Sequence, residues 1–484
     1  MNRRRTLSLV ALLVFFAVLA AACGQKAGVH STGLAAGGGG GLADGSTTAT
    51  SIDANGNIVA IDPATGQVIP SGGGGTSGGT SGGSGGGASA GTGGRSGSGG
   101  STGPSGPADR TGVTDSVIKI GIHAPASGAG APAPSFDMGK AVYFTFIGSS
   151  INGRRVEVVF KDDGYNPSQA VQACKSMVQN DHVFLLVGGA GTDQIVACAK
   201  YAASVGVPYL SEGVTENGLG NLPGVFAETM TYKAQGALLA QYIKKQGFTK
   251  VAMVRGNTGN FDDAHSGFLS GAQAQGLTMV KDLAINKDSG AAEVSNAASQ
   301  VCGARAGEAT DKHDVAVYPL MSPKLFINFA GAAAQQFQCF PRYAGIGITL
   351  GINIVAQGVC QVGGFKTGGT FFSPFQGIAS ANQVDPDYQK AYQAQNGQAG
   401  DDIGFSLWAA EKVIAAQLKG AGRDLSRQSF VASLKGKSFT TGVYPTVNFA
   451  NGPFGGTATH VLKVDCSKGS GGEFQTESQN NKSF

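Results

Sequence analysis

From Val117 onward the sequence alternates short apolar segments with longer segments of helical periodicity, and few folds have that pattern. Val117–Ile122, Val156–Phe160 and Val183–Val187 are apolar runs of strand length. Between the second and the third run, Asn166-Pro167 is typical of a helix start, with Asn166 as the N-cap. Strands that alternate with helices predict a parallel sheet covered by helices on both faces.

The alternation restarts further along the chain. The elements expected there are the helices Ala234–Lys245, His265–Gln275, Ala291–Val301 and Lys324–Phe337 and the strands Val251–Val254, Thr278–Leu283 and Val315–Tyr318. Two sets of similar size predict an α/β fold of two doubly wound lobes. Ligands of such sheets bind at the carboxyl ends of the strands, so we expect a site in the cleft between the lobes.

We expect the two lobes to occupy residues 115–466. The first lobe takes about 115–229 and 373–441, the second takes about 230–372 and 442–466, and residues 467–484 form a polar tail. Near the end, Thr446–Phe449 and Thr459–Val464 flank Asn451-Gly452, which predicts a hairpin.

Residues 1–22 have the composition of an export signal. Arg3–Arg5 supply positive charge, Leu7–Ala20 is apolar, and small residues precede Cys23. Small residues followed by Cys23 and glycine resemble a bacterial lipobox, although Ala20 stands where that pattern prefers leucine. We therefore expect a lipoprotein anchored to the cell membrane through Cys23, outside the cytoplasm, with secretion without a lipid as the alternative.

A glycine-rich segment separates Cys23 from the first apolar strand. Of the 79 glycines, 28 lie in residues 33–106. We expect residues 23–114 to be a flexible tether with a root-mean-square reach of roughly 50–60 Å. Within it, Thr50–Pro70 has an apolar pair beside turn-like Asn55-Gly56, which is compatible with a small hairpin. Because an isolated hairpin is marginally stable, we expect this segment to lack fixed structure.

Charge and motifs exclude several classes of function. The net charge is only +4, and Arg3–Arg5 supply three of the positive charges, so no nucleic-acid partner is expected. No apolar run of about 18 residues follows the leader, which argues against a membrane span. A P-loop, an HExxH motif and a strand-linked GxSxG motif are absent from the sequence. We therefore expect neither an enzyme nor a bound cofactor.

The cysteines indicate disulfides. Six cysteines follow Cys23, at Cys174, Cys198, Cys302, Cys339, Cys360 and Cys466. An even number in an exported chain predicts three disulfides, for which fifteen connectivities are possible. We expect Cys174 to pair with Cys198, because the two lie on consecutive helices, and Cys302 to pair with Cys339, because they lie near the ends of consecutive helices. The third expected pair is then Cys360 with Cys466. A metal site is not expected, since no CxxC occurs and no histidine lies within five residues of a cysteine.

Small residues fill the loops that follow three strands of the first lobe. These loops are Pro125–Gly128, Gly188–Thr192 and Ser211–Thr215. Each leads to a helix start or a turn, where unpaired N–H groups can bind a carboxylate. Three such loops on one sheet edge predict a cleft for a small anion or a small polar molecule.

These loops also carry a resemblance to a known family. The run Ile151–Ala170 (INGRRVEVVFKDDGYNPSQA), with Ala124–Gly128 before it and Val187–Thr192 after it, resembles the type I periplasmic binding proteins. The most similar branch is the leucine/isoleucine/valine-binding receptors of ABC importers, and the resemblance covers about residues 116–466. It implies a Venus-flytrap fold, two lobes joined by a hinge, which closes on a small solute and delivers it to an ABC permease.

The resemblance also implies ligand-binding positions. They are Ser127, Gly191, Thr192, Gly213, Thr215, Phe261, Met321 and Thr349. Thr192 stands where a hydroxyl and its N–H bind the ligand carboxylate, and Gly213 stands where a carbonyl binds the ammonium. Thr349 stands where amino-acid receptors place an acidic residue beside the ammonium. The absence of an acidic side chain at this position disfavours a solute with a cationic amine. An amide, a carboxylate or an aromatic compound therefore stays open as the solute.

We therefore expect a lipid-anchored solute receptor of an ABC importer. The alternative is a ligand-sensing module of the same fold that is not coupled to transport. The fold alone does not separate the two.

Overall fold

The computed structural model describes residues 49–52, 58–61, 108–128, 135–211, 218–304, 315–347 and 351–484. The chain divides into two compact units, Met1–Gly100 and Ser101–Phe484. In the first unit, β1 (Ala49–Ile52) pairs antiparallel with β2 (Ile58–Ile61). We expected this segment to lack fixed structure, and that expectation is wrong because the two strands form a small hairpin. The predicted signal, 1–22, and Cys23 lie outside the described residues.

The first lobe is built on a parallel sheet, which confirms the predicted fold class. Over the described residues this sheet has five strands in the order β4-β3-β5-β6-β7. They are β3 (Val117–Ala124), β4 (Arg155–Asp162), β5 (Leu185–Gly188), β6 (Tyr209–Ser211) and β7 (Val225–Ala227). All neighbouring strands run parallel, so their carboxyl ends meet at one edge.

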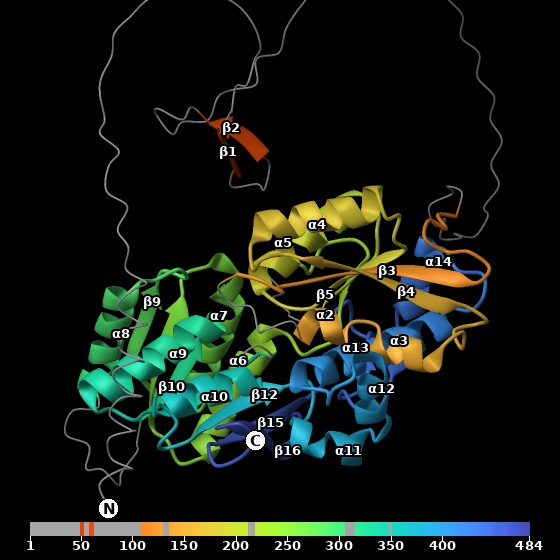
Figure 1. The fold of residues 1–484 in the computed structure, drawn as a ribbon. Coiled ribbons are helices and arrows are strands. Elements are labelled where there is room, and N and C mark those ends of the chain that lie inside the picture. Colours follow the sequence, from red (N-terminus) through yellow and green to blue (C-terminus); the bar gives the residue numbers. More distant parts are fainter. Residues whose placement is uncertain are drawn as a thin grey trace, which may run out of the picture. The chain divides into compact units, whose positions relative to one another are not determined.

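Helices cover both faces of this sheet (Figure 1). One face packs against α4 (Pro167–Gln179) and α5 (Thr192–Ser204), and the other lies toward α2 (Ser135–Gly139), α3 (Val142–Ile147), α12 (Asp387–Asn396), α13 (Asp402–Gly420) and α14 (Arg427–Leu434). The predicted start of α4 is confirmed, because the Asn166 side chain accepts hydrogen bonds from the N–H groups of Ser168 and Gln169. Both faces of the sheet are therefore buried, as its apolar strands require.

The second lobe has a larger, mixed sheet. In the described part of the chain it contains seven strands in the order β16-β15-β12-β11-β10-β8-β9. They are β8 (Lys250–Gly256), β9 (Thr278–Ile285), β10 (Val315–Leu320), β11 (Arg342–Gly345), β12 (Gly369–Ser373), β15 (Thr459–Asp465) and β16 (Glu473–Asn481). The first five are parallel, and β15 and β16 are antiparallel additions.

Helices also enclose the second sheet. On one face lie α6 (Tyr232–Lys245) and α7 (Asp262–Ala274), and on the other lie α8 (Ala291–Gly303), α9 (Pro323–Gly331) and α10 (Asn353–Gln361). Short helical turns η1 (Gly259–Phe261), η2 (Ala332–Gln336) and η3 (Ile378–Ser380) and the four-residue α11 (Ala381–Val384) complete the description. None of the described helices is long and apolar enough to cross a membrane.

The chain passes between the lobes at three places, and two predicted boundaries differ from the structure. The crossings lie between β7 and α6, between β12 and α12, and between Phe454 and β15. Residues 442–456 stay with the first lobe, because β13 (Ser438–Phe439) pairs with β14 (Val447–Asn448) and Phe454 bridges Ala227. The predicted hairpin is therefore wrong: β15 pairs with β12 and β16 instead. The predicted polar tail is also wrong, since β16 is an edge strand of the second sheet.

Segments from all three crossings meet around one small cavity. It is lined by Thr229 and Met230 from the first crossing, Pro374 from the second, and Ala458 and Thr459 from the third. The three connections therefore lie side by side, as a hinge between two lobes requires.

The structure contains the three expected disulfides. Cys174 is bonded to Cys198, Cys302 to Cys339, and Cys360 to Cys466. The first joins α4 to α5 in the first lobe, and the other two lie in the second lobe. No disulfide among the described residues ties one lobe to the other, so these bonds leave the hinge free to move.

A buried carboxylate stabilises the first lobe from within. Glu411 on α13 is 1% exposed and accepts hydrogen bonds from the N–H groups of Ala141, Tyr143 and Phe144, at 2.6, 2.8 and 3.4 Å. It thus caps α3, whose own N-cap residue offers no side-chain bond. Burial raises the pKa of Glu411 to about 8, although the three hydrogen bonds lower it.

This raised pKa predicts a pH-dependent stability. Between pH 4.5 and about 8 the folded chain holds a proton that unfolded Glu411 releases, so the free energy of unfolding falls as the pH rises. Buried Asp402, with a pKa raised to about 7 by burial, acts in the same direction. Buried His460, with a pKa lowered to about 4 by burial, acts oppositely, but only below pH 6.5. From pH 6.5 to 8 we expect a loss of roughly 1–2 kcal/mol.

Chemical denaturation at a series of pH values measures this slope. Glu411→Gln should flatten it above pH 6.5, whereas Glu157→Gln, at an exposed carboxylate of β4, should leave it unchanged. An equal slope in wild type and Glu411→Gln would contradict the assignment.

Candidate functional site

A pocket lies between the lobes at the carboxyl ends of the strands. Its wall is formed by Tyr165, Thr192, Asp193 and Gln194 of the first lobe and by Gly256, Thr258, Phe261, Lys287, Asp288, Ser322 and Leu325 of the second. The cavity measures about 60 Å³. This is the place that the alternation of strands and helices predicts for a ligand.

The first-lobe wall contains the N-terminus of α5. Gly191 is the N-cap residue and has a φ of 83°, and no side chain of the described residues caps this helix. This φ lies in the left-handed region, which side chains rarely adopt, so the turn before α5 requires glycine. The first N–H groups of a helix have no partner within the helix. The start of α5 therefore presents N–H donors and a positive dipole end to the pocket.

Thr192, one of the predicted ligand-binding positions, is the first residue of α5 and lines the pocket. Its side chain is hydrogen-bonded with that of Tyr232, the first residue of α6 in the second lobe. Burial raises the pKa of Tyr232, so its hydroxyl stays protonated. The Thr192 hydroxyl therefore contacts both the pocket and the opposite lobe.

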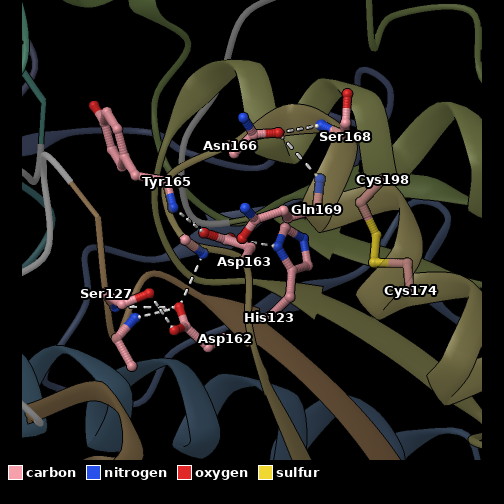
Figure 2. A network of polar contacts seen from close by, with 12 residues as sticks. His123, Ser127, Asp162, Asp163, Tyr165, Asn166, Ser168, Gln169, Cys174 and Cys198 are labelled. Atoms are coloured by element: carbon pink, nitrogen blue, oxygen red, sulfur yellow. Dashed lines mark hydrogen bonds and ion pairs between the residues drawn. A yellow bond between two sulfur atoms is a disulfide. The ribbon is translucent and has the colours of Figure 1, made fainter. Parts of the chain in front are cut away.

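Tyr165 enters the pocket from a turn after β4. Its φ is 55°, in the left-handed region, and its N–H donates to Oδ1 of Asp163 at 3.0 Å. Oδ2 of Asp163 lies 2.9 Å from Nδ1 of His123, whose Nε2 lies 2.7 Å from the Tyr209 hydroxyl. Asp163, His123 and Tyr209 are fully buried. In Figure 2 the Tyr165 ring extends away from this network, so a buried polar chain holds the turn that presents the ring.

The second-lobe wall combines an aromatic ring with polar groups. Phe261, another of the predicted ligand-binding positions, ends the turn η1 and lines the pocket. Ser322 caps α9 by accepting a hydrogen bond from the N–H of Leu325. Tyr165 and Phe261 therefore supply one aromatic ring from each lobe.

Three predicted site residues are placed outside this wall: Gly191, which is the N-cap of α5, Ser127 and Met321. The Ser127 hydroxyl donates to Oδ2 of Asp162 at 2.5 Å, and Oδ1 of Asp162 accepts the N–H of Ser127, so Ser127 belongs to a turn beside the network (Figure 2). Hydrogen bonds from this turn lower the pKa of Asp162 despite partial burial. Met321 is 3% exposed and packs in the core next to Ser322. Gly213, Thr215 and Thr349 lie outside the described residues, so their roles stay predictions.

Nine of the eleven residues of the wall were missed by sequence reasoning, since only Thr192 and Phe261 were among the predicted positions. Tyr165 stood only inside the run that carries the family resemblance, and Asp193 and Lys287 carried no motif. Asp193 and its hydrogen-bond partners in the second lobe are 65 to 94 residues apart in the sequence. A local sequence pattern therefore does not predict these contacts.

One buried cluster has metal-ligating side chains. His123, Cys174 and Cys198 have their ligand atoms within 4.8 Å of one another. The two cysteines form a disulfide, so their sulfurs do not offer thiolates to a metal. Figure 2 shows this disulfide beside the His123–Asp163 pair.

The family is identified by comparison with known proteins. A family model described as "Periplasmic binding protein" matches residues 117–470. The chain therefore belongs to the periplasmic binding proteins. The match covers both lobes and the pocket, and no curated protein matches.

Solved structures share the fold at low sequence identity. A fatty acid ABC transporter substrate-binding protein from Thermomonospora curvata is 17% identical, with a TM-score of 0.62, over 77% of this chain and 95% of that chain. A solute binding protein from Rhodopseudomonas palustris in complex with 3,4-dihydroxybenzoic acid is 17% identical, with a TM-score of 0.60, over 75% and 96%. A branched-chain amino acid transporter substrate binding protein from Streptococcus pneumoniae in complex with isoleucine is 17% identical, with a TM-score of 0.58, over 74% and 99%.

Proposed function

We propose that this chain is the solute receptor of an ABC importer, anchored outside the cytoplasm by a lipid on Cys23. It captures a small solute in the pocket between its lobes and delivers it to a permease. The observation that supports this proposal most strongly is that residues of both lobes line the pocket, with the uncapped N-terminus of α5 on one side. A site of this construction binds best when both lobes contact one molecule.

The polar wall favours a solute with a carboxylate. The N–H groups at the start of α5 and the Thr192 hydroxyl are donors, and the helix dipole adds a positive potential there. The rings of Tyr165 and Phe261 provide apolar surface from the two lobes. The proposed solute is therefore a small carboxylate whose apolar or aromatic body lies between these rings.

The carboxylates of the wall bear on whether the solute also carries an ammonium group. Asp193 already accepts hydrogen bonds from the second lobe, and Asp288 lines the pocket. Among the solved structures above, one holds isoleucine and one holds a dihydroxybenzoic acid. Pairs of solutes that differ only in the amine separate these two chemistries.

A thermal-shift screen of the full chain, with its disulfides intact, tests the proposal. The library contains leucine with isocaproate, phenylalanine with hydrocinnamate, benzoate, hydroxybenzoates and the corresponding amides. A solute at 100 times its Kd should stabilise the chain by ~2.7 kcal/mol. We expect the carboxylates to shift the melting temperature and the neutral amides to shift it less. No shift with any member would contradict the receptor proposal.

The same screen with Thr192→Val locates the binding group. Loss of one hydrogen bond to a charged group costs about 1.5–3 kcal/mol, so we expect roughly a 10- to 100-fold loss of affinity for carboxylates. Thr145→Val, on the exposed side of α3, is the matched control and should bind as the wild type does. Equal affinities in the two variants would remove Thr192 from the site.

A further inference from the structure

One carboxylate of the first lobe collects three donors from the second lobe. Oδ1 of Asp193 accepts the Thr258 hydroxyl at 2.8 Å and the Asn260 side-chain amide at 2.6 Å, and Oδ2 lies 3.3 Å from Nζ of Lys287. We call these four residues the Asp193 cluster. The Asp193 side chain is only 19% exposed.

The donors of the cluster come from separate segments of the second lobe. Thr258 and Asn260 lie in the turn around η1, directly after β8, and Lys287 lies in the loop after β9. The Thr258 hydroxyl also accepts the N–H of Asn260, which orders that turn. The cluster therefore joins two second-lobe loops to the start of α5.

We propose that Asp193 determines the affinity of this receptor by holding the two lobes together over the pocket, without binding the solute itself. The statement about affinity rests on the proposed function, whereas the statement about the lobes does not. A two-lobed receptor binds with an apparent affinity that scales with the population of its closed form. A bond that exists only when the lobes meet raises that population for every solute alike.

If Asp193 acted only through its charge, removing it would change the affinity for anions in the opposite direction from the one we propose. The two mechanisms can therefore be told apart by experiment. A negative charge in the first turn of α5 stabilises the helix dipole but repels a carboxylate bound at the same helix start. If Asp193 acted only through its charge, its removal would strengthen the binding of anions. If Asp193 acts through the lobes, its removal weakens the binding of every solute.

The first measurement needs no solute. Hydrogen exchange of the full chain, read in peptides that cover residues 192–196 and 256–261, reports how often the lobes separate. Asp193→Asn should raise the exchange rate in both segments several-fold. The matched control is Asp387→Asn, which removes an exposed carboxylate from the first turn of another helix, α12, outside the pocket. Asp387 takes no part in the bonds of the Asp193 cluster, so the control should exchange as the wild type does in both segments.

Lys287→Met tests the same cluster from the other lobe. Its side chain is 46% exposed, so the variant should fold even if Asp193→Asn does not. It should raise exchange in the same two segments, and the effects of the two variants should be less than additive, because both remove one ion pair. Unchanged exchange in both variants would overturn the proposal.

Binding of the solutes found in the screen provides the second measurement. Asp193→Asn should lower the affinity for all of them by a common factor of about 10. Asp387→Asn should leave these affinities unchanged. Tighter binding of carboxylates by Asp193→Asn would overturn the proposal. If neither the wild type nor any variant binds a solute, the proposed function fails. The hydrogen-exchange result then still decides whether the Asp193 cluster holds the lobes together.

Discussion

Replacing Cys360 and Cys466 together with serine should lower the free energy of unfolding by about 4–5 kcal/mol. The bond closes a loop of 106 residues, the longest of the three disulfide loops, and a loop near 100 residues is worth about 4.7 kcal/mol in chain entropy. Cys360 is half-buried and Cys466 is exposed, so little core packing is lost with the sulfurs. The measurement is equilibrium unfolding in denaturant under non-reducing conditions.

The other two disulfides serve as comparisons. Their loops span 24 and 37 residues, for Cys174–Cys198 and Cys302–Cys339, which predicts smaller entropic losses of roughly 3.5 and 3.8 kcal/mol. Cys174 and Cys198 are fully buried, so their variant also loses packing. An unchanged stability of the Cys360/Cys466 variant would mean that this bond does not constrain the unfolded chain.

Gly456→Ala should destabilise the chain by about 3 kcal/mol and disturb the hinge. Gly456 lies in the third crossing, and a Cβ there would lie 1.9 Å from N of Met230 and from C of Thr229 in the first crossing. Both contacts are with backbone, so no side-chain rotation relieves them, and the crossings would have to move apart. Denaturant unfolding measures the loss, and exchange of residues 228–231 reports the hinge.

Gly303→Ala is the matched control for this substitution. Gly303 is the last residue of α8, and a Cβ there meets no atom of the described residues within 4 Å. Alanine lowers the entropy of the unfolded chain, so a neutral or slightly stabilising effect is expected. If Gly456→Ala is as stable as this control, the crossings are not in close contact.

The sequence contained enough information for the architecture where local signals and burial agree. Asn166-Pro167 predicted the start of α4, and the apolar runs predicted the parallel strands. The edge strand β16 was missed because its sequence is polar, and only Phe474 among its residues is buried. A strand with one buried residue lacks the alternation that identifies a half-buried strand. Its pairing depends on the neighbouring β15, which a local pattern does not report.

The site was predictable in part for a similar reason. Thr192 and Phe261 follow strands in loops that the resemblance placed at the cleft, and both line the pocket. Tyr165 has a left-handed backbone conformation, which is uncommon for a large residue. The side chain of buried Asp163 stabilises this conformation by accepting the N–H of Tyr165. The partners of Asp193 are in the other lobe. Contacts of this kind depend on how the lobes meet, which no spacing within one lobe encodes.

The most direct test of the account is a crystal structure of the chain with the best carboxylate from the screen. We predict that the solute carboxylate contacts the N–H groups at the start of α5 and the Thr192 hydroxyl, with its body between Tyr165 and Phe261. We also predict that Asp193 keeps its bonds to Thr258 and Asn260. A solute bound outside the pocket, or a pocket that closes without contacting it, would contradict the account.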